Sequence, residues 1–66
     1  MLFCEQTKVV ANYNFKAEEP GELELQRGDI VCVTDKTDAS WWQGEITRNG
    51  VTVRGMFPCN YVSPYN

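Results

Sequence analysis

Apolar residues in this chain occur in short runs rich in β-branched side chains, and polar or glycine-bearing breaks separate the runs. The breaks recur roughly every 8 to 12 residues, which is typical of small all-β domains. No run repeats apolar residues at the spacing of an amphipathic helix. The pattern predicts strands at residues 8–13, 30–34, 41–47, 51–54 and 61–62, with a short apolar segment at 56–57.

Residues 22–25 alternate between acidic and apolar side chains, in the order Glu22, Leu23, Glu24 and Leu25. This alternation is typical of an extended segment with one face turned toward the core. Pro20-Gly21, just before it, predicts a turn. We therefore expect one arm of a hairpin, with the two leucines pointing inward.

Asn49-Gly50 separates two alternating runs and is the strongest short-range signal for a two-residue hairpin turn. Such a turn fixes which residues face each other across the two strands. The predicted partners are Thr47 with Thr52, Ile46 with Val53, and Glu45 with Arg54. A threonine pair, a β-branched pair and an opposite-charge pair each stabilise an antiparallel ladder, so the three pairs support one register.

Short strands without a covering helix must close on themselves or split into two packed sheets. We expect an all-β fold, a small five-stranded barrel of two packed antiparallel sheets, in a single domain. The expected core consists of apolar residues from these runs: Val9, Ala11, Leu23, Leu25, Val31, Val33, Phe57 and Val62.

The composition narrows the possible functions. The 66 residues suffice for one domain but not for two. Six Lys and Arg against nine Asp and Glu give a net charge of −3, the wrong sign for holding a nucleic-acid backbone. The chain has no histidine, so it lacks the usual general base and a common zinc ligand. We therefore expect no catalysis, metal, cofactor or nucleic-acid partner.

Three cysteines, Cys4, Cys32 and Cys59, are an odd number and form no Cys-x-x-Cys pair. The expectation is reduced thiols in a cytoplasmic protein, with Cys32 half-buried on a strand. No apolar run approaches the roughly 18 residues of a membrane span, and the first residues lack the pattern of a signal peptide. We expect no membrane insertion.

Four segments, in order and spacing, resemble the Src homology 3 (SH3) domain over about residues 9–62. They are Ala11-Asn12-Tyr13-Asn14-Phe15, Gly21-Glu22-Leu23 with Gly28-Asp29-Ile30, Trp41-Trp42, and Gly55-Met56-Phe57-Pro58-Cys59-Asn60-Tyr61-Val62. The resemblance implies a single SH3 domain at residues 1–66, with its core at about 8–64, excised from a larger protein. Members serve adaptor, signalling and cytoskeletal proteins.

Four residues depart from the family's pattern. Asn12 and Asn14 replace the usual Leu and Asp, Phe15 replaces a Tyr, and Met56 stands where an aromatic residue is common. Phe15 lacks a hydroxyl that could bond to a ligand. The groove aromatics are otherwise retained.

The resemblance implies recognition of proline-rich (PxxP) segments in the polyproline II conformation, which is stiff and has no internal hydrogen bonds. The residues at the family's groove positions are Tyr13, Phe15, Trp41, Pro58, Asn60 and Tyr61. The Trp41 indole, the Tyr61 hydroxyl and the Asn60 amide could donate to ligand carbonyls. Neighbouring strand residues point to opposite faces, so we assign Trp41 to the groove and Trp42 to the structural face.

Residues 16–24 carry four Glu and one Lys. In the family's architecture this loop lies beside the groove, and Glu22 matches a position that pairs with a ligand Arg or Lys. Glu18, Glu19 and Asp38 would extend the negative field. The expected partner is therefore a basic proline-rich segment bound to a monomeric domain.

Four alternatives remain at the level of sequence. The groove could hold a linker of its own parent protein as an intramolecular clamp, through the same residues. A nucleic-acid-binding barrel would need a basic groove. Ubiquitin recognition is associated in this family with Phe at the last groove aromatic, where this chain has Tyr61. An enzyme would need a pocket or metal set beside its carboxylates.

Overall fold

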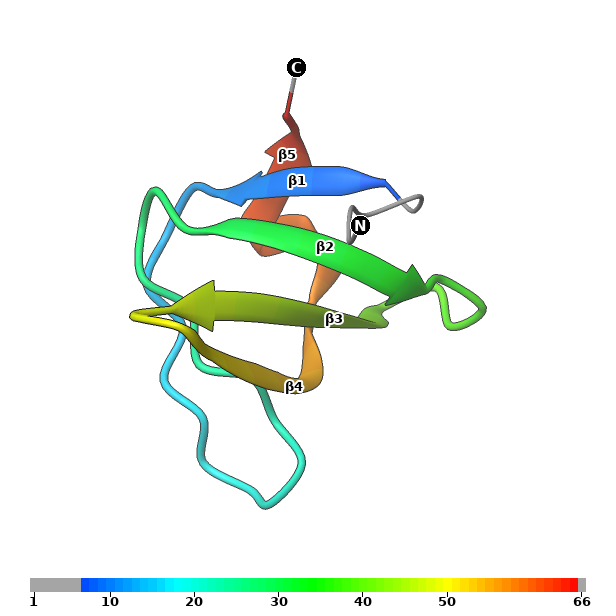
Figure 1. The fold of residues 1–66 in the computed structure, drawn as a ribbon. Coiled ribbons are helices and arrows are strands. Elements are labelled where there is room, and N and C mark those ends of the chain that lie inside the picture. Colours follow the sequence, from blue (N-terminus) through cyan, green and yellow to red (C-terminus); the bar gives the residue numbers. More distant parts are fainter. Residues whose placement is uncertain (1–6, 66) are drawn as a thin grey trace.

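Five strands and one short 3-10 turn make up the fold, which a computed structural model describes for residues 7–65 (Figure 1). The elements are β1 (Lys8–Ala11), β2 (Ile30–Asp35), β3 (Trp41–Arg48), β4 (Val51–Pro58), the 3-10 turn η1 (Cys59–Tyr61) and β5 (Val62–Pro64). The predicted all-β architecture is confirmed. Within the described residues, no helix is long and apolar enough to cross a membrane.

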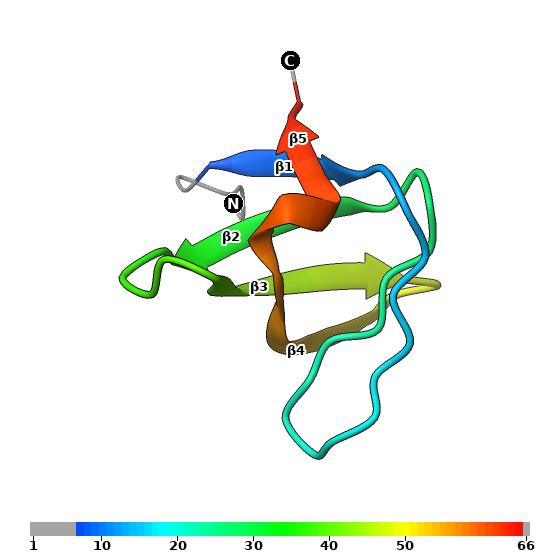
Figure 2. The same cartoon turned by 180° about the vertical axis from the view of Figure 1, so that it is seen from behind.

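The strands pair antiparallel in the order β4-β3-β2-β1-β5 and form one sheet. The expected small five-stranded barrel is thus present, but one continuous ladder builds it instead of two separately bonded sheets. The ladder is continuous because β1 pairs with both β2 and β5. Between β4 and β5 the η1 turn redirects the chain (Figure 2).

The β3–β4 hairpin has the predicted register, with Thr47 opposite Thr52 and Glu45 opposite Arg54. The two threonine hydroxyls lie 2.9 Å apart, and Arg54 Nε lies 3.3 Å from Glu45 Oε2. The turn residues Asn49 and Gly50 have φ angles of 53° and 79°. Two consecutive positive φ angles match the turn type whose twist suits a hairpin.

Three strand predictions differ from the structure. The first strand ends at Ala11, so Tyr13 lies in the loop that follows. Gly55 does not end the hairpin, because it pairs with Gly44 and β4 continues to Pro58. Tyr61 belongs to the η1 turn, and the last strand begins one residue later.

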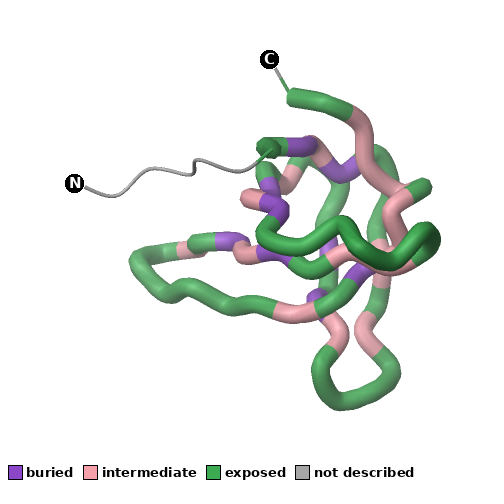
Figure 3. Tube along the Cα trace, turned by 90° about the vertical axis from the view of Figure 1, so that its right-hand side faces the viewer, coloured by how far each residue is buried: buried purple, intermediate pink, exposed green. Residues whose placement is uncertain are grey.

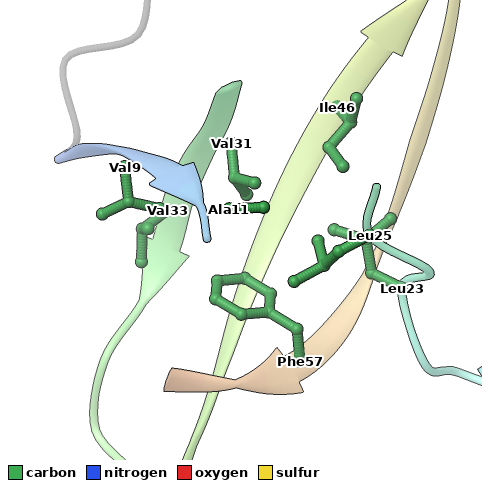
Figure 4. Close-up of a cluster of buried hydrophobic side chains, with 8 residues drawn as sticks. All are labelled: Val9, Ala11, Leu23, Leu25, Val31, Val33, Ile46 and Phe57. Carbon is green, nitrogen blue, oxygen red and sulfur yellow. The ribbon is translucent and has the colours of Figure 1, made fainter. Parts of the chain in front are cut away.

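The core is a single cluster enclosed by the curved sheet and the long loop (Figure 4). Its buried residues are Val9, Ala11, Leu23, Leu25, Val31, Val33, Ile46 and Phe57. Seven of these eight residues were predicted. Val62, also predicted, is half-buried and packs against the cluster. Ile46 is the core residue that was not predicted as such, because the sequence pattern indicated only its pairing with Val53 in the hairpin.

The loop between β1 and β2 projects away from the strands, as the cyan segment in Figure 1 shows, and is mostly exposed (Figure 3). Leu23 and Leu25 are buried and Glu24 is exposed, as the alternation predicted. Phe15 and Leu25 exchange backbone hydrogen bonds of 2.9 Å across the base of the loop. The loop is therefore anchored by its inner face while its charges reach solvent.

The cysteines match the sequence prediction in part. Cys32 lies half-buried on β2, as expected, but it is disulfide-bonded, so the expectation of reduced thiols is wrong at this position. Cys59 is a free thiol. Cys4 lies outside the described residues.

Candidate functional site

Four aromatic rings form a continuous row on one side of the molecule, which we call the aromatic row: Tyr13, Tyr61, Phe15 and Trp41. The ring centroids of Tyr13 and Tyr61 lie 5.6 Å apart. Phe15 lies 5.8 Å from both Tyr61 and Trp41. All three pairs meet edge to face, the arrangement that ring quadrupoles favour. The structure therefore brings all four predicted groove aromatics together.

The row is assembled from three distant parts of the chain. Phe15 is held by its backbone bonds to Leu25. The Tyr61 carbonyl accepts a 2.8 Å hydrogen bond from the Asn12 amide, which joins η1 to the residue before Tyr13. Trp41 begins β3, where its register partner is Pro58. Strand pairing at Trp41 and backbone hydrogen bonds at Phe15 and Tyr61 thus hold the rings in this order.

Pro58 and Asn60, the other two predicted groove residues, lie at the end of β4 and within η1. Pro58 is half-buried and Asn60 is exposed. The next amide, that of Cys59, donates to the Ser40 carbonyl at 2.9 Å, so this segment is tied to the residue before Trp41. Pro58, the register partner of Trp41, therefore lies near the Trp41 end of the row, and Asn60 directly precedes Tyr61 in η1.

Trp42 packs differently from Trp41. Its ring lies against the hydrophobic core, and the Lys36 ammonium lies 4.9 Å from its centroid. This contact is a cation–π interaction at an exposed site. The two neighbouring tryptophans therefore contact different parts of the molecule: Trp41 lies in the aromatic row, and Trp42 packs against the core.

A hollow of about 410 Å³ joins the row to the acidic loop, by which we mean residues 16–24. Its walls are Asn14, Phe15, Lys16, Glu18, Glu19, Glu22, Trp41 and Tyr61. Three predicted aromatics and three predicted acidic residues thus line one space. A ligand cation there would meet three carboxylates and one ammonium group.

A second hollow of about 310 Å³ lies between the loop tip and β4, lined by Glu19, Pro20, Gly21, Glu22, Trp41 and Met56. Met56 was noted only as a departure from the family's pattern and was not predicted as a site residue. A signal was available, because Phe57 is buried and the period of two places its neighbour on the outer face. Met56 is 36% exposed there.

Glu22 holds the acidic loop together as well as lining both hollows. Its Oε1 accepts hydrogen bonds from the Glu18 amide at 2.9 Å and the Glu19 amide at 3.3 Å. Glu24 Oε1 accepts from the Ala17 amide at 3.3 Å. Within residues 7–65, no hydrogen bond or ion pair occupies the side-chain carboxylates of Glu18 and Glu19.

Asp38 shapes the loop before Trp41. Its Oδ2 accepts hydrogen bonds from the Ser40 amide at 2.9 Å and the Trp41 amide at 2.8 Å. These bonds hold the pKa of Asp38 below its ordinary value of 3.8. Asp38 does not line either of the two hollows. It lies in the loop between β2 and β3, whereas the glutamates lie in the loop between β1 and β2.

The two asparagine departures both have partners. Asn14 Oδ1 accepts from the Arg27 amide at 2.8 Å across the base of the acidic loop. Asn12 Oδ1 accepts from the Ser63 hydroxyl at 3.2 Å, which links the loop start to β5. An amide oxygen meets these needs as a carboxylate would, without a charge.

Three comparisons with known proteins agree with this architecture. The family model of the SH3 domain matches residues 10–59. The SH3 domain-containing YSC84-like protein 1 of Rattus norvegicus and that of Mus musculus are each 43% identical over 58 residues, covering 85% of this chain. Those residues are only 16% of each relative's length.

The structure is also similar to solved structures of SH3 domains. The C-terminal SH3 domain of myosin IB from Entamoeba histolytica has a TM-score of 0.81 and 33% identity, covering 97% of this chain and all of that one (100%). The Acanthamoeba myosin I SH3 domain has a TM-score of 0.79 and 35% identity, covering 91% and 97%. The SH3 domain of the yeast actin-binding protein Abp1 has a TM-score of 0.78 and 35% identity, covering 89% and 98%.

Proposed function

Because this chain belongs to the SH3 domain family, a family of protein-interaction modules, we propose that it binds basic proline-rich segments along its aromatic row without catalysing a reaction. The observation that carries the proposal is the unbroken edge-to-face contact from Tyr13 to Trp41, with three glutamates at the Trp41 end. The row supplies ring surfaces, and the loop supplies charge.

Ring surfaces suit a polyproline II ligand for a physical reason. Such a segment has three residues per turn and exposes proline rings and free carbonyls. Prolines would pack between Tyr13, Tyr61, Phe15 and Trp41, and the Tyr61 hydroxyl and Trp41 indole would donate to ligand carbonyls. Because the ligand is already stiff, little ordering entropy opposes binding.

The acidic loop supports a preference for Arg or Lys in the ligand. Glu18 and Glu19 have carboxylates without an intramolecular partner in the described chain, so a ligand cation would meet them without first breaking a bond. Glu22 would add its second oxygen. Asp38 would contribute a longer-range field from the neighbouring loop.

Two of the similar structures hold a partner. The Acanthamoeba myosin I SH3 domain is bound to Acan125, and the Entamoeba histolytica domain is bound to a peptide of EhFP10(GEF). A short segment of another protein is the kind of ligand that we propose here. The same row could also hold a linker of the parent protein, since the chain spans only part of its curated relatives.

The test is a nuclear magnetic resonance titration of the chain with a panel of basic proline-rich peptides. We expect shifts at Tyr13, Phe15, Trp41 and Tyr61 that saturate with peptide. Shifts confined to the far face, or none with any peptide, would contradict the proposal. The cytoplasmic location and the monomeric state of the protein stay predictions. The redox state of Cys32 in cells would test the location, and the molecular mass in solution would test the monomeric state.

A further inference from the structure

Gly55 lies where the acidic loop crosses β4, and its missing side chain permits a contact between two backbones. A Cβ atom at this position would lie 2.7 Å from the Gly21 oxygen and 2.9 Å from both the Glu22 carbonyl carbon and the Leu23 nitrogen. Real Cβ contacts are essentially never this short. The obstructing atoms are backbone atoms, which cannot rotate away as a flexible side chain can.

Two hydrogen bonds fasten the loop at this crossing. The Met56 amide donates to the Gly21 carbonyl at 2.9 Å, and the Leu23 amide donates to the Met56 carbonyl at 2.7 Å. Glu22 and Met56 form a parallel bridge between them. Residues 21–23 therefore act as a very short additional strand on the edge of β4.

This crossing sets where the loop's charges lie. Gly21, Glu22 and Met56 line the hollow beside Trp41, and the Glu22 carboxylate in turn binds the Glu18 and Glu19 amides. A shift of residues 21–23 away from β4 would therefore carry all three glutamates away from Trp41.

We infer that Gly55 is a positioning residue, which holds the acidic loop close enough to Trp41 for its glutamates to select a basic ligand. The inference rests on the proposed function and adds to it a residue that touches no ligand itself. A methyl group at Gly55 would lift residues 21–23, lengthen both Met56 hydrogen bonds and weaken the preference for a ligand cation. The aromatic row would keep its own contacts, since none of them passes through Gly55.

Gly44, the strand partner of Gly55, does not have the same role, because different atoms surround it. A Cβ atom there would lie 2.7 Å from Val31 Cγ1 and 2.9 Å from Phe57 Cε2, inside the core. Alanine at Gly44 would disturb the core, whereas alanine at Gly55 would disturb the loop.

The experiment measures affinity for two proline-rich peptides that differ only by Arg or Gln at the basic position. We expect the parent chain to prefer the Arg peptide by about tenfold, the effect of one charge-assisted hydrogen bond. In Gly55→Ala the preference should fall to about twofold, mostly through loss of Arg-peptide affinity. Ile46→Val, a mild core change away from the loop, is the control for lost stability and should keep the parent preference.

Amide hydrogen exchange provides a readout that needs no ligand. In Gly55→Ala the Leu23 and Met56 amides should exchange at least tenfold faster, while the Ala11 amide, which donates to the Asp29 carbonyl at 2.9 Å, should not change. If the parent chain binds neither peptide, the proposed function fails, and unchanged exchange would separately refute the loop shift. An unaltered Arg preference in a folded Gly55→Ala would overturn the inference, as would an unfolded variant, because Gly55 would then serve the barrel itself.

Discussion

At the scale of single residues, several charged side chains bind their own backbone besides presenting charge to solvent. Glu22 accepts from two loop amides, and Asp38 accepts from two amides that lead into Trp41. Ionised acceptors make stronger hydrogen bonds than neutral ones. The same carboxylates that would attract a basic ligand therefore also give the loops around Trp41 a defined shape.

The two tryptophans should respond differently to truncation. Trp41→Ala should reduce peptide affinity by more than tenfold while leaving the free energy of unfolding within about 1 kcal/mol, since its ring contacts Phe15 at the surface. Trp42→Ala should lower that free energy by about 1.5 kcal/mol or more, because its ring packs against the core. Calorimetric titration and urea unfolding measure the two quantities. Equal binding losses in two fully folded variants would contradict the assignment.

Glu22 and Glu24 allow a comparison at constant net charge. Each side-chain Oε1 accepts from a loop amide, and glutamine keeps an oxygen there, so Glu22→Gln and Glu24→Gln remove charge with limited loss of loop bonds. Only Glu22 lines the hollows beside Trp41. Glu22→Gln should therefore weaken binding of an Arg peptide about fivefold or more, and Glu24→Gln less than twofold.

The ligand side completes that cycle. Changing the ligand Arg to Lys should weaken binding to the parent chain, since Lys lacks the planar two-point fork. The same change should matter less in Glu22→Gln, and calorimetry on the four combinations gives the coupling. Equal losses for the two Glu variants, without coupling, would refute the role of Glu22.

At the scale of elements, sequence predicts what local rules determine. The hairpin register follows from Asn49-Gly50, and the inward leucines follow from a period of two. Gly55 escaped the same rules, because the need for a residue without a Cβ atom comes from a loop that lies more than 30 residues earlier in the chain. Long-range backbone contacts of this kind leave no local pattern.

The stability of the hairpin turn should be more sensitive to substitution of Gly50 by alanine than to substitution of Asn49 by glycine. Both have positive φ angles, but Asn tolerates that region and Ala does not. Gly50→Ala should lower the free energy of unfolding by roughly 1–2 kcal/mol, and Asn49→Gly should change it little. Urea unfolding of both variants tests this, and similar stability for Gly50→Ala and the parent chain would show that the turn adopts another form.

The contribution of the loop between β2 and β3 to the stability of the fold should decrease at acidic pH. The Thr37 hydroxyl and amide hold the pKa of Asp35 below its ordinary value, and the Ser40 and Trp41 amides do the same for Asp38. A lowered folded-state pKa means that the ionised form stabilises the fold above the ordinary value of 3.8, and this stabilisation is lost as the pH falls through the folded-state pKa.

The free energy of unfolding should therefore decrease as the pH is lowered from about 5 toward about 2. The double variant Asp35→Asn/Asp38→Asn should show a shallower decrease, since amides do not titrate in that range. Urea unfolding at a series of pH values compares the two slopes. Identical slopes would mean that the hydrogen bonds to these carboxylates do not persist in solution.

At the scale of the whole molecule, the core and the proposed binding surface are largely separate. The buried cluster draws on every strand except β5 and on the inner face of the loop between β1 and β2. The aromatic row consists of residues at a strand end, in η1 and in the loop between β1 and β2. The sequence predicted most members of both sets. It did not predict the single continuous sheet, because pairing of β1 with two neighbours is a property of the closed chain.

The charge of the whole domain should appear in the salt dependence of binding. The chain carries a net charge of −3, and the acidic loop concentrates negative charge beside Trp41. A shallow groove and a short ligand predict a Kd of roughly 1–100 µM. Raising the ionic strength from about 0.01 M to 1 M shortens the screening length from about 30 Å to 3 Å, so a basic peptide should bind several-fold more weakly at high salt, while its uncharged analogue should not. Titrations of both peptides across that range measure the difference, and parallel salt curves would mean that the glutamates do not contribute to binding.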